Sequence, residues 1–402
     1  MNHIVRKILY VSSILLVILV FAAGYKSIRE KRVEEQAVSN TDAEENVQSE
    51  PVENTAENEE SIGVDWTENE KETEKPDEIE ADAESVKSEA ERDGETVLVF
   101  TGDILIGNSV SANYSAGGID GVLSEGMKNL LQDADITMVN EEFPFGTRGT
   151  AMEDKQYTFR VNPSYVTMFQ DMGVDIVSLA NNHVLDFGTE ALEDTLVTLD
   201  DAGILYAGAG TTKERAMELR IIEKNGKKFG FLAASRVIPV ASWNVENQAP
   251  GVFATYDATA LNAAIAEAKQ SCDYVTVFVH WGLEHKEYPE DYERTLAAGY
   301  VNAGADLVIG SHSHCLQGAE YINGKPVFYS LGNFLFGQDG NTAAVKVTVA
   351  EDGGMQYSFV AAKEEGAYTR ELTGAEAKNL YSYLDSISSH ASVDENGVLS
   401  EE

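Results

Sequence analysis

The sequence contains little cysteine, with Cys272 and Cys315 as the only two among 402 residues. Two cysteines are too few for the disulfide framework that stabilises small secreted proteins. The residues that flank them have the character of a buried strand and of a polar loop, so we expect two free thiols. Cysteine usage therefore does not identify the compartment of the protein.

Basic residues are also scarce. Lys and Arg number 29 against 68 Asp and Glu, which gives a net charge of −39. Binding to nucleic acid requires clustered Lys and Arg against the phosphates, so we exclude nucleic acid as a partner. The acidic excess is uneven, because residues 34–95 hold about two dozen Asp and Glu and four basic residues.

An apolar run of nearly bilayer-spanning length lies close to the N-terminus. Residues 8–24 carry no charge and follow Arg6 and Lys7. The run is at the lower edge for a transmembrane helix and is longer than a typical signal-peptide core. We interpret residues 1–32 as an uncleaved transmembrane anchor region, with a cleaved signal or a buried soluble helix as alternatives. Basic residues flank the run on both sides, so its orientation is open from charge alone.

Residues 33–95 are rich in Glu, Asn and Ser and poor in apolar side chains. Such a segment buries too little surface to offset the entropy cost of ordering, so we expect an acidic disordered linker. Repulsion between its charges favours an extended tether, and an acidic interaction segment is the alternative. We expect the folded part to begin at Thr96.

From Thr96 onward, apolar β-rich runs alternate with amphipathic segments, which is typical of a layered α/β domain. Three helical segments end in glycine directly before an apolar run, and glycine there supplies a left-handed cap. We take residues 96–337 as the main domain. Residues 338–402 complete it with an antiparallel hairpin (343–350 and 355–362), a final helix (375–387) and a frayed end. The three glycines are Gly173, Gly203 and Gly304.

Polar side chains follow the apolar runs of the predicted sheets. Ligands of layered α/β folds lie beyond the carboxyl ends of the strands, so we expect these side chains to meet. Five of the seven histidines fall in these loops, together with carboxylates and asparagines. The residues concerned are Asp103, Glu141, Glu142, Asn182, His183, Asp186, His280, His285, His312, His314 and Asn333.

This set of residues has the composition of a metal site. Imidazole, carboxylate and amide oxygen are ligands of Zn, Mn and Fe, and the set exceeds what one ion needs, which favours two. His312 and His314 occupy alternate positions of a predicted extended segment and would point the same way. Adjacent strand residues face opposite sides, so only one of Glu141 and Glu142 can face the metal, and the spacing favours Glu142.

Each of these residues also has an ordinary structural interpretation. Asp103 could cap a helix, Asn182 could form a turn, and His280 could be a core histidine. The metal-site hypothesis depends on all of them meeting. Glycines that flank them would allow tight turns or close approach of a substrate. These glycines are Gly102, Gly107, Gly282, Gly310 and Gly332.

Six short blocks of this region resemble the CapA family of bacterial poly-γ-glutamate capsule synthesis proteins. They occur in the family's order and together cover about residues 97 to 337. That family is similar to calcineurin-like metallophosphoesterases, so the resemblance implies an αββα sandwich of the metallo-dependent phosphatase type with a dinuclear site. The blocks are residues 101–103, 140–144, 179–188, 280–284, 310–314 and 329–334.

The resemblance implies roles for individual residues. His183 would be the acid that protonates a leaving oxygen, and Asp186 would orient its ring. Two departures from the phosphoesterase pattern affect one metal position: Leu105 stands where the pattern has a histidine, and Glu142 stands for its second aspartate. The ligands of one or two divalent ions (Mn, Fe or Zn) would be Asp103, Glu142, Asn182, His280, His312 and His314.

Two functions are therefore expected. The first is a membrane-anchored, extracytoplasmic protein that acts in poly-γ-glutamate synthesis or export, beside a synthase complex or in contact with the anionic polymer. The alternative is a cell-surface metal-dependent hydrolase, phosphoesterase-like and unrelated to polyglutamate. An acidic domain repels a polyanion in bulk, so the polymer would have to bind locally and through the metal.

Overall fold

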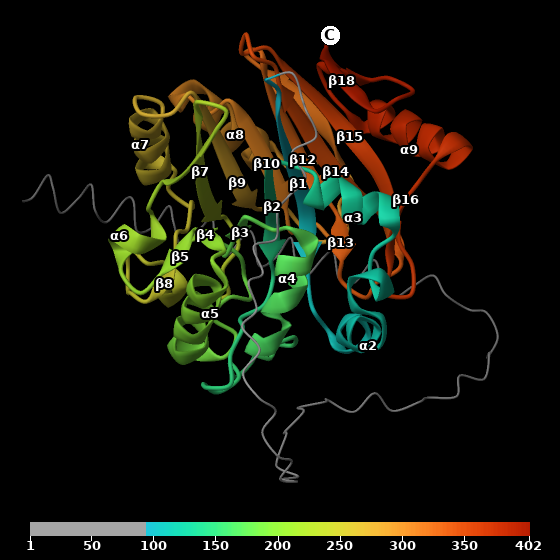
Figure 1. Cartoon of the computed structure of the whole chain (residues 1–402). Coiled ribbons are helices and arrows are strands. Elements are labelled where there is room, and N and C mark those ends of the chain that lie inside the picture. Colours follow the sequence, from blue (N-terminus) through green and yellow to red (C-terminus); the bar gives the residue numbers. More distant parts are fainter. Residues whose placement is uncertain (1–93) are drawn as a thin grey trace, which may run out of the picture. The chain divides into compact units, whose positions relative to one another are not determined.

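The computed structural model of the protein describes residues 94–402 (Figure 1). The predicted anchor at residues 8–24 and nearly all of the predicted linker at 33–95 lie outside the described residues. Within residues 94–402, no helix has both the length and the apolar composition needed to cross a membrane. The apolar runs form strands and the amphipathic segments between them form helices, which confirms the predicted α/β class.

The first large sheet is built around β1 (Thr96–Ile104), in which all nine residues are buried. Its order is β17-β18-β15-β14-β1-β2-β3-β4, with β13 paired to β1 and β16 to β15. Strands β1 to β4 are parallel, and β14 joins β1 in antiparallel orientation. The other strands are β2 (Ile136–Glu141), β3 (Ile176–Ser178), β4 (Leu205–Ala207), β13 (Asn333–Leu335), β14 (Gly340–Val349), β15 (Met355–Glu364), β16 (Thr369–Glu371), β17 (Ala391–Val393) and β18 (Val398–Glu401).

The second sheet has the order β11-β12-β10-β9-β7-β6. Phe278 and Ile309 pack in the core shared with the first sheet, whereas Val277 and Val308 belong to a separate core with the helices. Because side chains alternate along a strand, the inner strands are buried on both faces. The strands are β6 (Arg220–Lys224), β7 (Lys227–Ser235), β9 (Tyr274–His280), β10 (Leu307–Ser311), β11 (Leu316–Ile322) and β12 (Lys325–Leu331); β5 (Ala209–Gly210) pairs separately with β8 (Gly251–Val252).

Helices pack against both sheets (Figure 1). The apolar side chains of α7 and α8 share a core with the second sheet, and those of α3, α4 and α5 share a core with the first. The predicted glycine caps are confirmed, with φ of 74°, 72° and 121° at Gly173, Gly203 and Gly304. The helices are α2 (Asn108–Gly117), α3 (Glu125–Gln132), α4 (Val166–Met172), α5 (Gly188–Ala202), α6 (Lys213–Ala216), α7 (Thr259–Ala268), α8 (Asp291–Ala303) and α9 (Gly374–Ile387).

The C-terminal region extends the first sheet. β14 and β15 form the predicted hairpin, and α9 corresponds to the predicted final helix. The prediction of a frayed end is wrong, because β17 and β18 pair with each other and β18 pairs with β15. Ala391, Val393 and Leu399 are buried there. Strands of three and four residues show too little alternation to be recognised from sequence.

Candidate metal centre

The side chains at the strand ends of both sheets converge on one buried cluster. Asp103 and Asn140 lie near the ends of β1 and β2, and the amide of Asn140 donates to Oδ1 of Asp103 at 2.7 Å. His280 and Ser311 end β9 and β10, and Nδ1 of His280 lies 2.9 Å from Oγ of Ser311. Nδ2 of Asn140 is 3.4 Å from the same ring nitrogen, so the two sets of strand ends meet at this point.

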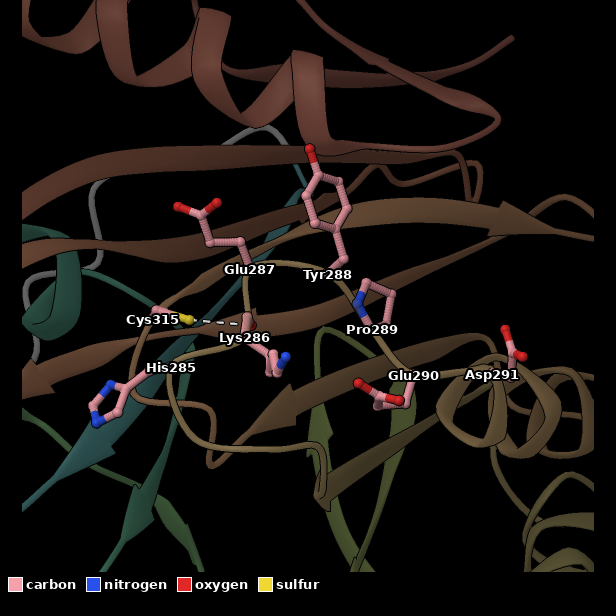
Figure 2. A pocket seen from close by; sticks show the side chains of 8 residues that line it. All are labelled: His285, Lys286, Glu287, Tyr288, Pro289, Glu290, Asp291 and Cys315. Carbon is pink, nitrogen blue, oxygen red and sulfur yellow. Dashed lines mark hydrogen bonds between the residues drawn. The ribbon is translucent and has the colours of Figure 1, made fainter. Parts of the chain in front are cut away.

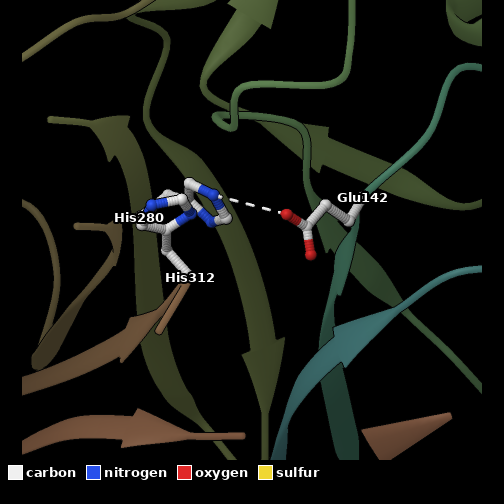
Figure 3. Close-up of side chains that lie close together, drawn as sticks. All are labelled: Glu142, His280 and His312. Atoms are coloured by element: carbon white, nitrogen blue, oxygen red, sulfur yellow. Dashed lines mark ion pairs between the residues drawn. The ribbon is translucent and has the colours of Figure 1, made fainter. Parts of the chain in front are cut away.

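Two groups of three potential ligands lie in this cluster, and Glu142 belongs to both. Glu142, His280 and His312 form one group (Figure 3), and Asp103, Glu142 and His314 form the other; within each, the ligand atoms lie within 4.8 Å of one another. Oε1 of Glu142 is 3.5 Å from Nε2 of His280, and Oδ2 of Asp103 is 3.7 Å from Nδ1 of His314. A carboxylate shared by two neighbouring groups suits a two-metal site.

Asn182 extends the first of these groups. Its Oδ1 lies 2.7 Å from Nε2 of His280 and can serve as an amide oxygen ligand. Glu141, the last residue of β2, belongs to neither group, as the alternation of strand side chains predicts. The structure thus brings together all six side chains expected as ligands: Asp103, Glu142, Asn182, His280, His312 and His314.

The buried polar atoms of the cluster fit a bound cation. Both carboxylate oxygens of Glu142 and Nδ1 of His312 are buried and lack a hydrogen-bond partner among the described residues. Burial raises the pKa of Glu142 well above its ordinary value, and the neighbouring Asp103 raises it further. Burial lowers the pKa of His312 to about 3 and that of His280 well below its ordinary value. The imidazoles of His280 and His312 are therefore neutral, and the buried carboxyl group of Glu142 needs a counter-charge when it ionises. Neutral imidazole and carboxylate are the donors that Mn, Fe and Zn prefer.

The backbone that carries His312 and His314 is strained. Their φ angles are 98° and 55°, in the left-handed region that costs residues with a Cβ about 1–3 kcal/mol each. The two rings, 5.9 Å apart between centroids, therefore reach the cluster from a bend and not from the predicted extended segment. The N–H of His312 donates to Oδ2 of Asp103 at 3.1 Å, and Oδ1 of Asn333 lies 2.8 Å from Nδ1 of His314. Strain held by such contacts is typical of functional sites.

His183 and Asp186, expected as an acid and its orienting partner, lie beside the cluster. Nδ1 of His183 is 2.7 Å from Oδ2 of Asp186, which also accepts from the N–H of Phe159 at 2.8 Å. The ring of Phe159 lies against that of His183, with 4.5 Å between centroids. Burial lowers the pKa of His183, and the hydrogen bond to Asp186 opposes this shift. The carboxylate of Asp186 thus holds the imidazole of His183 in one orientation through its Nδ1 atom.

Comparison with known proteins identifies the family. The model of the family described as bacterial capsule synthesis protein PGA_cap matches residues 97–338. The chain belongs to this family. The resemblance inferred from the six sequence blocks is thereby confirmed, and the matched range contains every residue of the cluster described above.

Curated relatives of this PGA_cap protein carry names from polymer biosynthesis. The PGA biosynthesis protein CapA of Bacillus subtilis (strain 168) is 31% identical over 258 residues, which cover 64% of this chain and 67% of the relative. The capsule biosynthesis protein CapA of Bacillus anthracis is 29% identical over 248 residues, 60% of each chain. A probable polyglutamine synthesis accessory protein of Mycobacterium tuberculosis is 28% identical over 215 residues, 51% of this chain and 57% of the relative. The similarity thus spans roughly three fifths of the relatives' length.

Lys155 of this PGA_cap protein completes the group around His183 and was not predicted. Its Nζ pairs with Asp186, donates to the carbonyl oxygen of Asn182 at 2.6 Å and lies 3.0 Å from Nδ1 of His183. Burial lowers the pKa of Lys155, and the charge of Asp186 opposes this shift. No spacing rule connects a lysine in a loop with a histidine 28 positions later. The sequence therefore did not indicate that Lys155 lies beside His183.

A pocket of about 650 Å3 adjoins the cluster (Figure 2). It is lined by residues 285–291 and Cys315, and the ring of His285 lies 6.3 Å from that of His314. His285 belongs to neither ligand group and so lines the pocket beside the cluster. Sγ of Cys315 is 3.2 Å from the carbonyl oxygen of Lys286. Cys272 and Cys315 are both free, which confirms the prediction of two thiols.

Two of the glycines near the cluster allow close packing of backbones. A Cβ on Gly102 would overlap the carbonyl oxygen of Gly332, and one on Gly310 would overlap that of Tyr329. The N–H of Asp103 donates to the same oxygen of Gly332 at 3.0 Å. At Gly102 and Gly310, therefore, the missing side chain admits the backbone of a neighbouring segment.

Proposed function

We propose that this protein acts in poly-γ-glutamate synthesis or export and that a divalent-metal site at its strand ends carries this role. The observation on which the proposal rests is Glu142, a buried carboxyl group that is shared by two ligand groups and lacks a hydrogen-bond partner among the described residues. Burying such a group without a hydrogen bond or a counter-charge is costly, and one or two ions would remove that cost. The names of the relatives support the polymer as the biological context.

The arrangement of layers supports assignment to the metallo-dependent phosphatase type. Two sheets share one core, helices pack on both of them, and the potential ligands lie at the carboxyl ends of strands. Leu105 is buried in the apolar core and supplies no ligand, so the group of Asp103, Glu142 and His314 lacks the histidine that the phosphoesterase pattern has at this position. We therefore expect the group of Glu142, Asn182, His280 and His312 to hold its ion more tightly.

The chain supplies groups for proton transfer beside these ligands. A bound divalent ion would contribute Lewis acidity, which acidifies water and stabilises negative charge on a substrate. His183 would protonate the leaving group, a contribution of about 10²- to 10⁴-fold for general acid catalysis. Asp186 holds Nδ1 of that imidazole, and Lys155 balances the buried charge of Asp186.

The pairing of His183 with Asp186 also supports a second function. A metal that only braced loops in an export component would not need an oriented imidazole beside it. A cell-surface hydrolase of phosphoester-like substrates, with no part in polymer synthesis, would use the same groups. Family membership does not fix the chemistry of a site, so the two functions are separated by experiment.

The proposed location is the outer side of the cell membrane. Residues 1–32 would form a single span, and the acidic segment 33–95 would hold the folded domain near a synthase complex or the anionic polymer. The support is the uncharged apolar run at 8–24 and the acidic composition that follows it. Replacing residues 1–32 by a cleavable secretion signal should abolish polymer production, whereas normal output from the released domain would contradict this location.

Variants of His183 and Glu142 test the function. His183→Asn should retain metal yet lose hydrolysis of phosphodiesters or γ-linked glutamate oligomers by about 10²- to 10⁴-fold, whereas Glu142→Gln should lose metal and activity. His390→Asn, an exposed histidine remote in sequence from the cluster, is the matched control. Loss of phosphodiester hydrolysis without effect on cellular polymer would favour the second function. Full hydrolysis and full polymer output from both variants would contradict both functions.

A further inference from the structure

Arg236 borders the metal cluster through its backbone. It directly follows β7, whose last residue, Ser235, is the register partner of His280 in β9. The N–H of Arg236 donates to the carbonyl oxygen of His280 at 2.7 Å. Arg236 lies just beyond the end of β7, and its guanidinium lies near Tyr292 of α8.

Two tyrosines hold the guanidinium of Arg236. Its Cζ lies 3.9 Å from the ring centroid of Tyr256 and 5.1 Å from that of Tyr292, at the start of α8. Tyr292 is itself fixed, because its hydroxyl accepts from the N–H of Gly282 at 2.8 Å. Stacking uses the faces of a guanidinium and leaves the N–H groups along its edge available.

The guanidinium N–H groups of Arg236 have no acceptor within residues 94–402. Arg160 donates to two backbone carbonyl oxygens. The guanidinium of Arg236, in contrast, forms neither an ion pair nor a hydrogen bond with the described residues and contacts two tyrosine rings. The other five arginines of this region each pair with a carboxylate: Arg148, Arg215, Arg220, Arg294 and Arg370. Among the described arginines, Arg236 therefore differs in having neither a carboxylate nor a carbonyl oxygen at its guanidinium, although the chain carries a net charge of −39.

Two acidic residues at the start of α8 already serve another purpose. Glu290 and Glu293 form the capping box at the start of this helix, in which Oε2 of Glu293 accepts from the N–H of Glu290 at 2.7 Å. Both carboxylates are thus placed to satisfy the free N–H groups of the first turn. The helix start presents Tyr292 to Arg236, and an external anion can take the place that a carboxylate of the chain takes at the other arginines.

We propose that Arg236 binds a carboxylate of the substrate, next to the unit that lies at the metal cluster. This inference rests on the proposed function in poly-γ-glutamate synthesis. A γ-linked glutamate chain carries one free α-carboxylate on every unit, and a planar guanidinium fork matches a carboxylate through two parallel hydrogen bonds.

Binding of a short γ-linked glutamate oligomer to the purified, metal-loaded chain tests this inference. The comparison probe is the same oligomer with its α-carboxylates converted to amides. Arg236→Met should weaken binding of the acid oligomer by about 10- to 100-fold and leave binding of the amidated oligomer unchanged. Arg236→Lys keeps the positive charge but not the two parallel N–H donors, so its affinity for the acid oligomer should lie between those of the unchanged chain and Arg236→Met. Arg215→Met is the matched control, because Arg215 stacks 3.9 Å from the ring of Tyr206 but is paired with Glu218.

Three results would overturn the inference, and they have different meanings for the proposed function. Equal binding of the acid oligomer by Arg236→Met and the unchanged chain would exclude Arg236 as its ligand and leave the function standing. Equal loss for acid and amidated oligomers, or loss of metal in Arg236→Met, would show that the residue only supports the loop. No binding of either oligomer by the unchanged, metal-loaded chain would remove the polymer as substrate, and the inference with it.

Discussion

Nε2 of His280 lies 2.7 Å from Oδ1 of Asn182, although 98 positions separate the two residues. His280 ends β9 in the second sheet, and Asn182 follows β3 in the first. Their contact therefore joins the two sheets at the edge where the other potential ligands gather. A cation held by both residues would tie the sheets together, which couples metal binding to the stability of the fold.

Glu142 and His314 should differ in their effect on metal content. Glu142→Gln weakens both ligand groups and should remove most of the bound metal, whereas His314→Ala affects one group and should leave the ion of the other. Elemental analysis of the desalted proteins gives the ratio directly. Equal and complete loss in both variants would show that the two groups do not bind separately.

The pH dependence of stability should reveal the buried carboxyl group of Glu142. Burial raises the pKa of Glu142, so this carboxyl group stays protonated in the folded metal-free protein at pH values where it is ionised in the unfolded chain. The free energy of unfolding therefore falls as the pH rises above about 4.3, the pKa of a glutamate in an unfolded chain. Glutamine at position 142 does not titrate, so the metal-free variant Glu142→Gln should melt at a higher temperature than the metal-free parent at pH 8. The expected increase is about 2 °C for each kcal/mol by which the free energy of unfolding rises. The difference should vanish near pH 4. A melting temperature that is lower for the variant at pH 8 would contradict this account of Glu142.

Lys155 and Asp186 should depend on each other for stability. The side chains are 13% and 0% exposed, so Lys155→Met leaves a buried carboxylate without its cation and should cost about 3–5 kcal/mol. Adding Asp186→Asn should recover part of that loss. Denaturant unfolding of both single variants and the double variant measures the coupling, with Lys378→Met in the exposed pair with Glu395 as a control worth about 0–1 kcal/mol. Additive effects in the double variant would contradict a coupled pair.

Gly102 should tolerate no side chain, whereas Gly107 should. A Cβ at Gly102 would overlap the carbonyl oxygen of Gly332, and the nearest atom to a Cβ at Gly107 is Cγ of Leu105, 3.9 Å away. Gly102→Ala should therefore lower the melting temperature strongly or prevent folding, and Gly107→Ala should change it little. Thermal unfolding of the two variants side by side decides the point. Similar stability of both variants would mean that the strands beside Asp103 can move apart.

Much of the fold and the position of the site could be predicted because both depend on local patterns. Alternating apolar residues predicted the hairpin of β14 and β15, and the polar residues after the apolar runs identified the side chains that meet at the strand ends. Alternation of side chains predicted that only one of Glu141 and Glu142 faces the cluster, and the motif spacing selected Glu142.

The parts that could not be predicted depend on contacts between distant segments. Lys155 and Arg236 lie in loops whose paths are set by packing, and neither belongs to a recognisable spacing. The bend at His312 and His314 is held by Asp103 and Asn333 from other strands, so the local sequence suggested an extended segment instead. β18 is stabilised by pairing with β15 and β17 by pairing with β18, and neither strand carries much signal of its own.

The metal content of the purified chain is the most direct test of the central claim. Elemental analysis of the protein after desalting should find about one to two divalent ions per chain. The double variant His280→Ala/His312→Ala should contain none, while His390→Ala should match the parent. Absence of bound metal from the parent, or equal metal in parent and double variant, would contradict a metal site at the strand ends and the function proposed for it.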